Sequence, residues 1–487
     1  MRLVARFPVS TRHALHLAAS IGVLVVVALT LGWASASVAA CALGFAILTW
    51  RAPPYGLLAA VFLVGIEGSL KLALAGYEYP FSVPGEALGA AFIDVSLFGA
   101  IAVLVLRDRG RTLRRVWDET ARWERVAFGS LGAWLLLSVA QIAQSGDLLQ
   151  GLMGFRLTQA YVAAALAGLI VLWPGRGRDA TLTVLLAIVG AVSAYAAVRV
   201  AVGPTIAQIN ESLTRNYSFS AEVFRAVGSF SSPIGLAGFI TPAGAFAVAV
   251  AFLRPRYRPL GLAIAACALV AIIASYQRVA IVAFVASLIV MAAYALSQRR
   301  VSARSKRAVV VGVASVLAVG AVGTAVAGAV SPVTAERARG LLVPLQDEAI
   351  RDRLELWGTT IAAVGEQPLG AGLGQVGRAT GPELEATVSA DNSYLKVLFE
   401  QGVLGGFLFV VGVIGAAIAV GRRLAGGSGP DWALGVAALC GFVAFLVMMV
   451  TGEYIESPGK VLAWTLLGVA AAQAFGSSSH ARSGEPS

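Results

Sequence analysis

The chain has 487 residues, of which 58% are hydrophobic and only 13% are charged. Soluble globular proteins carry about 25% charged residues, so a chain this apolar could not cover its own surface in water. It must use lipid as its solvent, where only helices or a closed barrel satisfy the backbone hydrogen bonds. The formal net charge is +11, but no nucleic-acid partner is expected, because the basic residues gather in loops as they do in membrane proteins.

The apolar segments predict helices rather than barrel strands. Each lasts about 17 to 24 residues without alternation in polarity, which fits helices that cross a hydrocarbon core about 30 Å thick. We therefore expect an all-α, polytopic integral membrane protein with about fourteen transmembrane helices in the lipid bilayer. The predicted spans are 14–32, 34–50, 54–75, 87–106, 126–144, 157–173, 180–202, 230–253, 259–275, 278–297, 308–330, 402–421, 432–451 and 459–475.

Near the N-terminus, residues 38–41 (Val-Ala-Ala-Cys) look like the cleavage site of a lipoprotein signal sequence. The apolar run continues past Cys41 to Trp50, which favours an uncleaved helical hairpin instead. Cys267 and Cys440 also lie in apolar runs. We interpret all three cysteines as small packing residues rather than as disulfide or metal-binding residues.

Basic loops alternate along the chain with loops that contain little Lys or Arg. Because basic loops remain in the cytoplasm, both termini are predicted to be cytoplasmic. The basic stretches are the N-terminus, Arg51, 107–125, Arg176 with Arg178, 254–258, 299–307, Arg422 with Arg423, and the C-terminus. The opposite side then carries three longer segments, at 145–156, 203–229 and 331–401.

The segment 331–401 is too patterned to be a linker. Five apolar residues at spacings of four and three predict one face of an amphipathic helix; they are Ile350, Leu354, Trp357, Ile361 and Val364. A glycine-rich turn at 368–374 and a short helix that leads into a span follow. We therefore divide the chain into transmembrane helices at 1–330, a large ordered loop at 331–401, transmembrane helices at 402–475 and a disordered tail at 476–487.

Chemistry is expected on the side opposite the basic loops. The basic loops are short except 107–125, and none holds a phosphate-binding glycine loop before Lys and Ser or Thr. The three histidines, His13, His16 and His480, lie at the chain ends, which excludes a histidine-based mechanism on the other side. We expect neither a cofactor nor a metal ion.

Arginines on that side are candidates for binding phosphate, because a guanidinium binds phosphate bidentately and stays charged at membrane depth. Arg278 is the most informative, since it follows a tight turn between two spans where the positive-inside rule disfavours a lone arginine. Arg225 and Arg156 come next, ahead of Arg351 and Arg353. The alternative is that these arginines snorkel or form structural ion pairs.

Two further positions could carry chemistry or merely stabilise helices. Asp391 is the candidate catalytic carboxylate, but an Asp before Asn-Ser-Tyr-Leu would also be a good helix N-cap. Glu67 and Lys71 lie four residues apart in the third predicted span, so they share a helix face and can pair. We interpret that pair as structural.

Four features of the sequence between about 225 and 405 resemble the O-antigen ligase and polymerase superfamily, which includes the Wzy-type polymerases. Their order, spacing and membrane side carry the resemblance. They are 225–230 (Arg-Ala-Val-Gly-Ser-Phe) with Pro233; the turn that ends at Arg278; 353–357 (Arg-Leu-Glu-Leu-Trp) with 367–372 (Gln-Pro-Leu-Gly-Ala-Gly); and 391–395 (Asp-Asn-Ser-Tyr-Leu) with 400–405 (Glu-Gln-Gly-Val-Leu-Gly).

The resemblance implies a GT-C-like glycosyltransferase of the bacterial inner membrane with its active site in the periplasm. Such enzymes use sugars carried on undecaprenyl pyrophosphate. Polymerases join lipid-linked repeat units into O-antigen, capsule or exopolysaccharide, with a chain-length regulator protein as a possible partner. The resemblance also implies Asn392 and Tyr394, with the arginines named above, as substrate-binding residues.

Ligases of this superfamily carry a histidine before the matching asparagine, where this chain has Asp391. We therefore expect an inverting, metal-independent polymerase, with Asp391 and Arg278 as its catalytic residues. The alternatives are a ligase or O-oligosaccharyltransferase that moves the glycan to lipid A-core or protein, another polysaccharide transferase such as a teichoic-acid transferase, and a flippase-type transporter. A transporter is disfavoured because no repeated halves or interrupted helices at the bilayer midplane are found.

Overall fold

The computed structural model describes residues 38–75, 85–173, 178–215, 219–220, 223–297, 303–330, 348–377, 391–427 and 429–483. In these ranges the chain is helical apart from turns and one antiparallel ladder of two two-residue strands, β1 (Phe219–Ser220) and β2 (Val223–Phe224). Nine helical stretches are long and apolar enough to cross a membrane, or ten if the bent pair α2 and α3 is one span. The prediction of an all-α, polytopic membrane protein is confirmed.

The predicted count of about fourteen spans is matched only in part. The segment 14–32 lies outside the described residues, and two predicted spans correspond to shorter apolar helices, Val38–Arg51 and Lys460–Gly476. The first of these helices runs through Cys41 without a break. The third predicted span is bent by 70° between α2 (Pro53–Gly65) and α3 (Glu67–Ala75).

The remaining elements follow in chain order. They are α4 (Gly85–Asp108), α5 (Arg111–Glu119), α6 (Arg122–Gln141), α7 (Leu148–Thr158), α8 (Ala163–Val171), α9 (Arg178–Val202), α10 (Ile206–Arg215), α11 (Pro233–Leu253), α12 (Arg258–Ala274), α13 (Arg278–Ser297), α14 (Ala303–Val330), α16 (Glu348–Glu366), α17 (Ser393–Ala425), α18 (Gly429–Met448), the 3-10 turn η8 (Tyr454–Glu456) and α19 (Lys460–Ser483).

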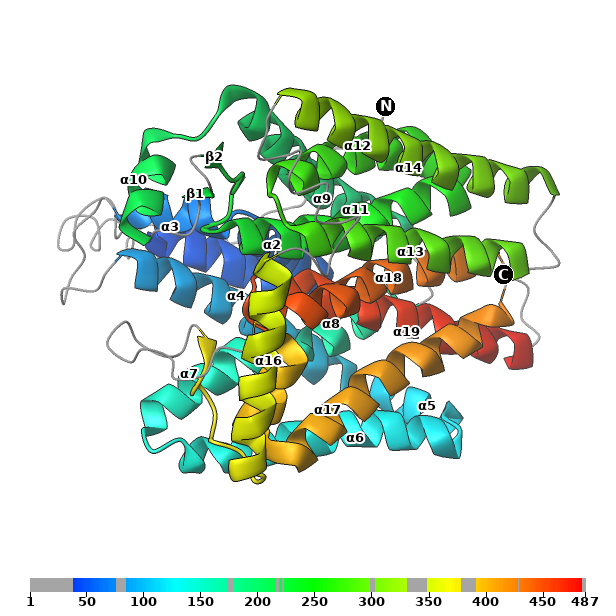
Figure 1. The fold of residues 1–487 in the computed structure, drawn as a ribbon. Helices are drawn as coiled ribbons and strands as arrows, with labels where there is room; N and C mark the ends of the chain where they lie inside the picture. The colour runs from blue at the N-terminus through cyan, green and yellow to red at the C-terminus, as the bar shows by residue number, and fades with distance from the viewer. Residues whose placement is uncertain are drawn as a thin grey trace, which may run out of the picture.

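Helix α11 forms the centre of the bundle, packed between α12, α13 and α18 (Figure 1). Every residue from Gly235 to Ala251 is buried. This helix is apolar all round, as expected of a helix without a solvent face. Its small residues let the neighbouring backbones approach closely. A methyl group on Gly244, for example, would lie 2.8 Å from the Cβ of Ala268.

Basic side chains gather at one end of the bundle, which we call the arginine-rich end. There Arg423, late in α17, forms an ion pair of 2.7 Å with Glu124 at the start of α6 and stacks on Phe475 of α19. Arg254, after α11, pairs with Asp179 at the start of α9 at 3.1 Å. In Figure 1 this end lies on the right, where α5 and the C-terminus lie.

Helix α17 is broken at Gly402, where the backbone (φ 69°, ψ −175°) is not helical. The glycine-rich turn predicted at 368–374 packs against this break and makes up for the lost helical hydrogen bonds. The N–H groups of Ala371 and Gly372 donate to the carbonyls of Phe399 and Glu400, both at 3.0 Å, and Val403 donates to Pro368. The structure thus contains both the glycine turn and the short helix before a span that the sequence predicts.

Helix α16 confirms the predicted amphipathic helix but not the face that it buries. Thr360 and Val364 face the protein, whereas Leu354 and Ile361 of the predicted stripe are exposed. The reason is that α16 crosses the bundle beside the first part of α17 and contacts it over only a short length (Figure 1). Its apolar stripe is therefore wider than the contact it makes.

Two predicted boundaries also shift. The segment 145–156 is not a loop, because α7 begins at Leu148 and continues with α8 as one candidate span, Leu148–Val171. Asp147 caps this helix by accepting a hydrogen bond from the N–H of Leu149. At the C-terminus, α19 extends to Ser483, beyond the predicted end near 475, since no proline interrupts it before Pro486.

Candidate functional site

The N-terminus of α17 is fastened to the turn between α18 and α19 by one serine. The Ser393 hydroxyl donates to the carbonyl of Gly452 at 2.7 Å and accepts from the N–H of Ile455 at 3.2 Å. These two bonds bring Asp391, two residues before Ser393, to Glu453 and Tyr454, although the two segments lie about sixty residues apart in the sequence. A set of polar side chains collects around this junction.

Asp391 forms an ion pair with Arg353 of α16. The Arg353 Nε lies 2.5 Å from the Asp391 Oδ2, and the two side chains are 37% and 30% exposed. Burial raises the pKa of Asp391, and the positive charge of Arg353 opposes that rise. Asp391 does not cap α17: Asn392 does, since its side-chain oxygen accepts from the N–H groups of Tyr394 and Leu395. The alternative interpretation of Asp391 as an N-cap is therefore wrong.

Arg225 and Arg278 come to this junction through the turn between α12 and α13. The Arg225 Nε donates to the carbonyl of Ser275 at 3.3 Å, and Arg278 is the first residue of α13. Next to Arg278, the Gln277 side chain accepts a hydrogen bond of 3.2 Å from the Tyr454 hydroxyl. Burial raises the pKa of Tyr454, and the charges that act on this hydroxyl are those of Asp391, Arg353 and Arg225.

The structure therefore brings four of the predicted site residues to this junction. The charges of Arg225, Arg353 and Asp391 act on Tyr454, and Arg278 directly follows Gln277, which accepts the hydrogen bond of Tyr454. We call these four, with Tyr454, the arginine–aspartate cluster. Arginines that are already in position can stabilise negative charge that develops on a phosphate. A carboxylate beside them can orient a hydroxyl or accept its proton.

Three other predicted residues have different surroundings. Asn392 uses its oxygen for the helix cap, and the Tyr394 hydroxyl donates to the carbonyl of Leu446 while its ring lies 5.8 Å from that of Phe409. Arg351 is exposed on α16, two residues before Arg353. These contacts give Asn392 and Tyr394 structural tasks, and substrate contacts for all three stay a prediction.

Arg156 belongs to a different place, a polar cavity of about 220 Å³ between the helices. There it is ion-paired with Asp94, which also accepts a hydrogen bond from Tyr161. The same cavity contains the predicted pair of Glu67 and Lys71, which the structure confirms. None of the four predicted residues of the arginine–aspartate cluster lines this cavity, so Arg156 is not part of that cluster.

A group of fully buried charges behind the cluster was not predicted from the sequence. The ammonium of Lys396 on α17 lies 2.7 Å from a carboxylate oxygen of Glu400 and 3.0 Å from one of Glu456. Glu400 also accepts from the N–H of Gly374, at 3.0 Å. The spacing of four between Lys396 and Glu400 within a largely apolar run was the available sequence signal, and so was the pair of glutamates at 453 and 456 between two apolar segments.

Glu453 lies between this buried group and the arginine–aspartate cluster. Its pKa is raised to about 7, mainly by burial, with Lys396 opposing the rise and Glu456, Glu400 and Asp391 adding to it. Gly377 approaches the carboxylate so closely that a Cβ atom there would lie 2.6 Å from it. The sequence predictions did not include Glu453, because the pair of glutamates at 453 and 456 does not by itself show that Glu453 is buried beside Lys396 and Asp391.

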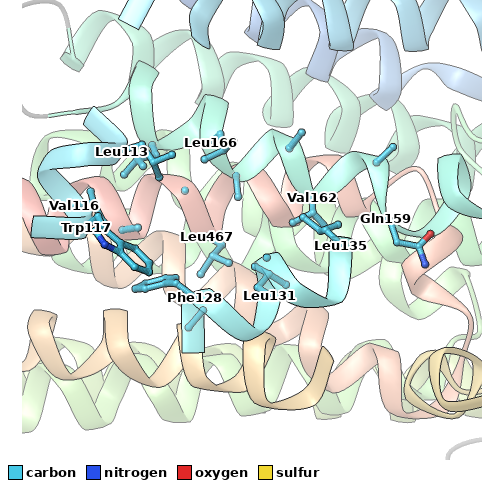
Figure 2. Close-up of a pocket in the computed structure, with 18 of the residues that line it drawn as sticks. Leu113, Val116, Trp117, Phe128, Leu131, Leu135, Gln159, Val162, Leu166 and Leu467 are labelled. Atoms are coloured by element: carbon cyan, nitrogen blue, oxygen red, sulfur yellow. The ribbon is translucent and has the colours of Figure 1, made fainter. Parts of the chain in front are cut away.

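An apolar groove of about 970 Å³ runs along the bundle, lined by residues of α5, α6, α8, α17 and α19 among others. Figure 2 shows Leu113 and Trp117 towards one end and Gln159 at the other, with aliphatic side chains such as Leu135 and Leu166 between them. Such a lining can hold a hydrocarbon chain. None of the predicted site residues lines the groove.

In the part of the chain that the structure describes, no group of three or more His, Cys, Asp or Glu side chains could hold a metal ion.

Comparison with known proteins agrees with the resemblance seen in the sequence. No curated protein matches the chain. Residues 262–410 match the Wzy_C family model, which is described as O-antigen ligase. The matched segment contains Arg278, Arg353 and Asp391 as well as the break in α17. This match, over about a third of the chain, supports the similarity to the O-antigen ligase and polymerase superfamily.

Proposed function

We propose that this protein is a membrane glycosyltransferase that polymerises oligosaccharide repeat units carried on undecaprenyl pyrophosphate. The observation that carries the proposal is the arginine–aspartate cluster, in which Asp391 is held by Arg353 close to Arg225 and to the turn before Arg278. Three of these residues lie in the segment that matches the superfamily. The cluster combines groups suited to a pyrophosphate with a carboxylate suited to a hydroxyl.

In this mechanism Arg225 and Arg278 bind the pyrophosphate of the donor. As the bond between the sugar C1 and the pyrophosphate oxygen breaks, the electron pair stays on the pyrophosphate, where the two guanidinium groups stabilise it. The terminal hydroxyl of a second lipid-linked unit attacks C1 from the opposite face, which inverts the anomeric centre. Asp391 orients that hydroxyl and takes up its proton.

The membrane orientation is part of the proposal. The arginine-rich end would face the cytoplasm, by the positive-inside rule. The cluster and α16 would then face the periplasm of a bacterial inner membrane, where flipped lipid-linked sugars are available. Helix α16 and the glycine-rich turn at 368–374 border the cluster and would help to exclude water, which would otherwise hydrolyse the donor.

A second candidate function is glycan transfer to lipid A-core or to protein. The description of the matching family as O-antigen ligase favours it. Asp391, at the position where ligases carry a histidine, favours the polymerase. The acceptor distinguishes the two: a polymerase uses a second lipid-linked repeat unit, and a ligase uses a different molecule.

The direct test is to incubate the purified protein with undecaprenyl-pyrophosphate-linked repeat units and to separate the products on a gel. We expect a ladder of chains spaced by one repeat. Arg278→Ala and Asp391→Asn should each reduce ladder formation about 100-fold or more, since one electrostatic or acid–base group contributes roughly that factor. Arg122→Ala is the matched control, because Arg122 is exposed at the arginine-rich end, and it should leave the ladder unchanged.

Other outcomes would redirect the assignment. Donor consumed only when lipid A-core or a protein acceptor is added would identify a ligase. Lipid-linked units that cross the bilayer of a proteoliposome without any new glycosidic bond would identify a transporter and contradict the enzyme assignment.

A further inference from the structure

The proposed reaction releases a proton from the acceptor hydroxyl, and a second carboxylate, Glu453, interacts electrostatically with Asp391. Asp391 precedes α17, and Glu453 lies in the turn between α18 and α19. Ser393 joins the two segments through its hydrogen bonds to Gly452 and Ile455. These two residues flank Glu453 and Tyr454 in the turn. The inference that follows rests on the proposed function and extends it to the route of that proton.

The two carboxylates differ in how firmly they are held. Asp391 is bound by Arg353 at 2.5 Å, and an arginine partner favours the ionised form of a carboxylate. For Glu453, in contrast, no side chain within the described ranges forms an ion pair or hydrogen bond with the carboxylate. Asp391 is thus fixed in orientation by an ion pair that protonation would weaken, whereas protonation of Glu453 breaks no ion pair within the described ranges.

The surroundings of Glu453 make it a better place for a proton. The charged groups that face it are Lys396 and Glu400 on α17, Glu456 on η8, and Asp391. The segment 371–377, which approaches it through Gly377, contains no charged residue. Lys396 is already shared between Glu400 and Glu456. Burial, together with the three negative neighbours, favours the protonated form of Glu453, and Lys396 opposes them.

We infer that Glu453 is a positioning residue that receives, from Asp391, the proton given up by the acceptor hydroxyl. In the balanced step, the acceptor oxygen forms its bond to C1 while the bond from C1 to the pyrophosphate breaks, and the electron pair leaves with the pyrophosphate. The hydroxyl proton passes to Asp391 and then to Glu453, so that Asp391 returns to its ion pair with Arg353 before the next addition.

The raised pKa of Glu453, about 7, agrees with this role, because a proton acceptor works best when its pKa lies near the operating pH. Only ionised Glu453 can accept the proton. Turnover should therefore fall as the pH decreases through about 7. The negative charge of Glu456 raises the pKa of Glu453, so removal of that charge should move this acid limb to lower pH.

The test is the pH dependence of ladder formation for the full-length protein and three variants. Glu453→Gln should reduce turnover about 100-fold and remove the acid limb while binding of the lipid-linked donor is kept. Glu453→Asp should keep part of the turnover together with an acid limb. Glu456→Gln is the matched variant from the same turn, and it should keep an acid limb that lies at lower pH than in the wild type. Wild-type turnover and an unchanged acid limb in Glu453→Gln would overturn the inference.

Infrared difference spectra recorded during a pH titration test the coupling without any turnover. A carboxyl band that titrates near neutral pH should disappear in Glu453→Gln and move to lower pH in Asp391→Asn, because the Asp391 charge is removed. A band that titrates at the same pH in Asp391→Asn as in the wild type would overturn the relay even if ladders form. Absence of ladders from the wild type, with the coupled band present, would instead contradict the proposed function. If Glu453→Gln does not fold, Glu453→Asp is combined with Glu456→Gln and compared with the wild type. The carboxyl band and the acid limb of this double variant should lie at lower pH. A band or acid limb identical to that of the wild type would overturn the inference.

Discussion

At the scale of single residues, the candidate site depends on which neighbouring side chain performs which task. Asp391 and Asn392 are adjacent, and either could have capped α17. The cap belongs to Asn392, so Asp391 is available to Arg353. Asp391 adopts a positive φ of 37°, a conformation that Asp and Asn tolerate better than most residues. The backbone thus directs two polar side chains of consecutive residues to separate partners.

The pKa of Glu453 leads to a prediction about stability that does not depend on the reaction. Its pKa is raised from 4.5 to about 7, so the folded state binds this proton more tightly than the unfolded state does. That contribution to stability is fully present below pH 4.5 and is lost as the pH rises through about 7. We expect the Tm of the wild type to fall between these values, and the Tm of Glu453→Gln to fall less.

Thermal unfolding in detergent across this pH range checks the prediction. Glu355→Gln is a suitable control, because Glu355 is exposed on α16 and its loss should leave the slope of Tm against pH unchanged. Parallel curves for the wild type and Glu453→Gln would show that Glu453 ionises as readily in the folded protein as in the unfolded chain.

At the scale of elements, the break in α17 is what allows one helix to serve both the site and the membrane span. Before Gly402 the helix carries Lys396 and Glu400, and after it the helix continues as an apolar span to Ala425. The glycine-rich turn at 368–374 supplies the N–H donors that the broken helix lacks. On the other face, Gln141 of α6 donates to the carbonyls of Leu369 and Gln401, at 3.3 and 3.1 Å, and so fastens the same junction to the bundle.

Replacement of Gly402 should therefore be costly. Its backbone angles (φ 69°, ψ −175°) belong to a region that is essentially restricted to glycine, where other residues pay about 1–3 kcal/mol. A Cβ atom would also lie 2.3 Å from the Pro368 carbonyl oxygen. We expect Gly402→Ala to lower the Tm by several degrees and to impair ladder formation.

Gly129→Ala in α6 is the matched control. A methyl group there meets nothing within 4 Å, and alanine is favoured over glycine inside a helix by about 0.5–1 kcal/mol. The Tm of this variant should stay level or rise. Equal Tm values for Gly402→Ala and the wild type would mean that the chain does not need the break where the structure has it.

At the scale of the whole molecule, two groups of charged side chains lie at opposite ends of the helix bundle. The arginine-rich end joins α5, α6, α17 and α19 through Arg423 and its partners. The arginine–aspartate cluster forms where α13, α16, α17 and η8 meet. Bringing together segments so far apart in the sequence requires the packing of the complete bundle, so the cluster is a property of the tertiary structure.

The orientation of this bundle in the membrane can be tested with single cysteines. In a background without Cys41, Cys267 and Cys440, Glu366→Cys at the end of α16 should react with a membrane-impermeant maleimide in intact spheroplasts. Arg122→Cys at the arginine-rich end should react only after permeabilisation. Both positions are exposed, so accessibility within the protein does not bias the comparison. The reverse labelling pattern would place the cluster in the cytoplasm.

The sequence by itself determined that the chain is a helical membrane protein, because hydrophobicity over the length of a span is a local property. It also predicted Arg225, Arg278, Arg353 and Asp391 as site residues, since each lies in a short motif, and the structure brings them to one junction while their roles stay a prediction. For Arg156 the prediction does not match the structure. Its motif resembled the others, yet Arg156 and its partner Asp94 line a polar cavity that none of those four residues lines.

Only the tertiary structure decided which charges meet. Lys396, Glu400, Glu453 and Glu456 come from two segments that the sequence marks as an apolar run and a turn. Whether a carboxylate is buried, paired or left to take a proton depends on contacts between residues far apart in the chain. Such contacts are fixed by how whole helices pack, and no local pattern of residues records them.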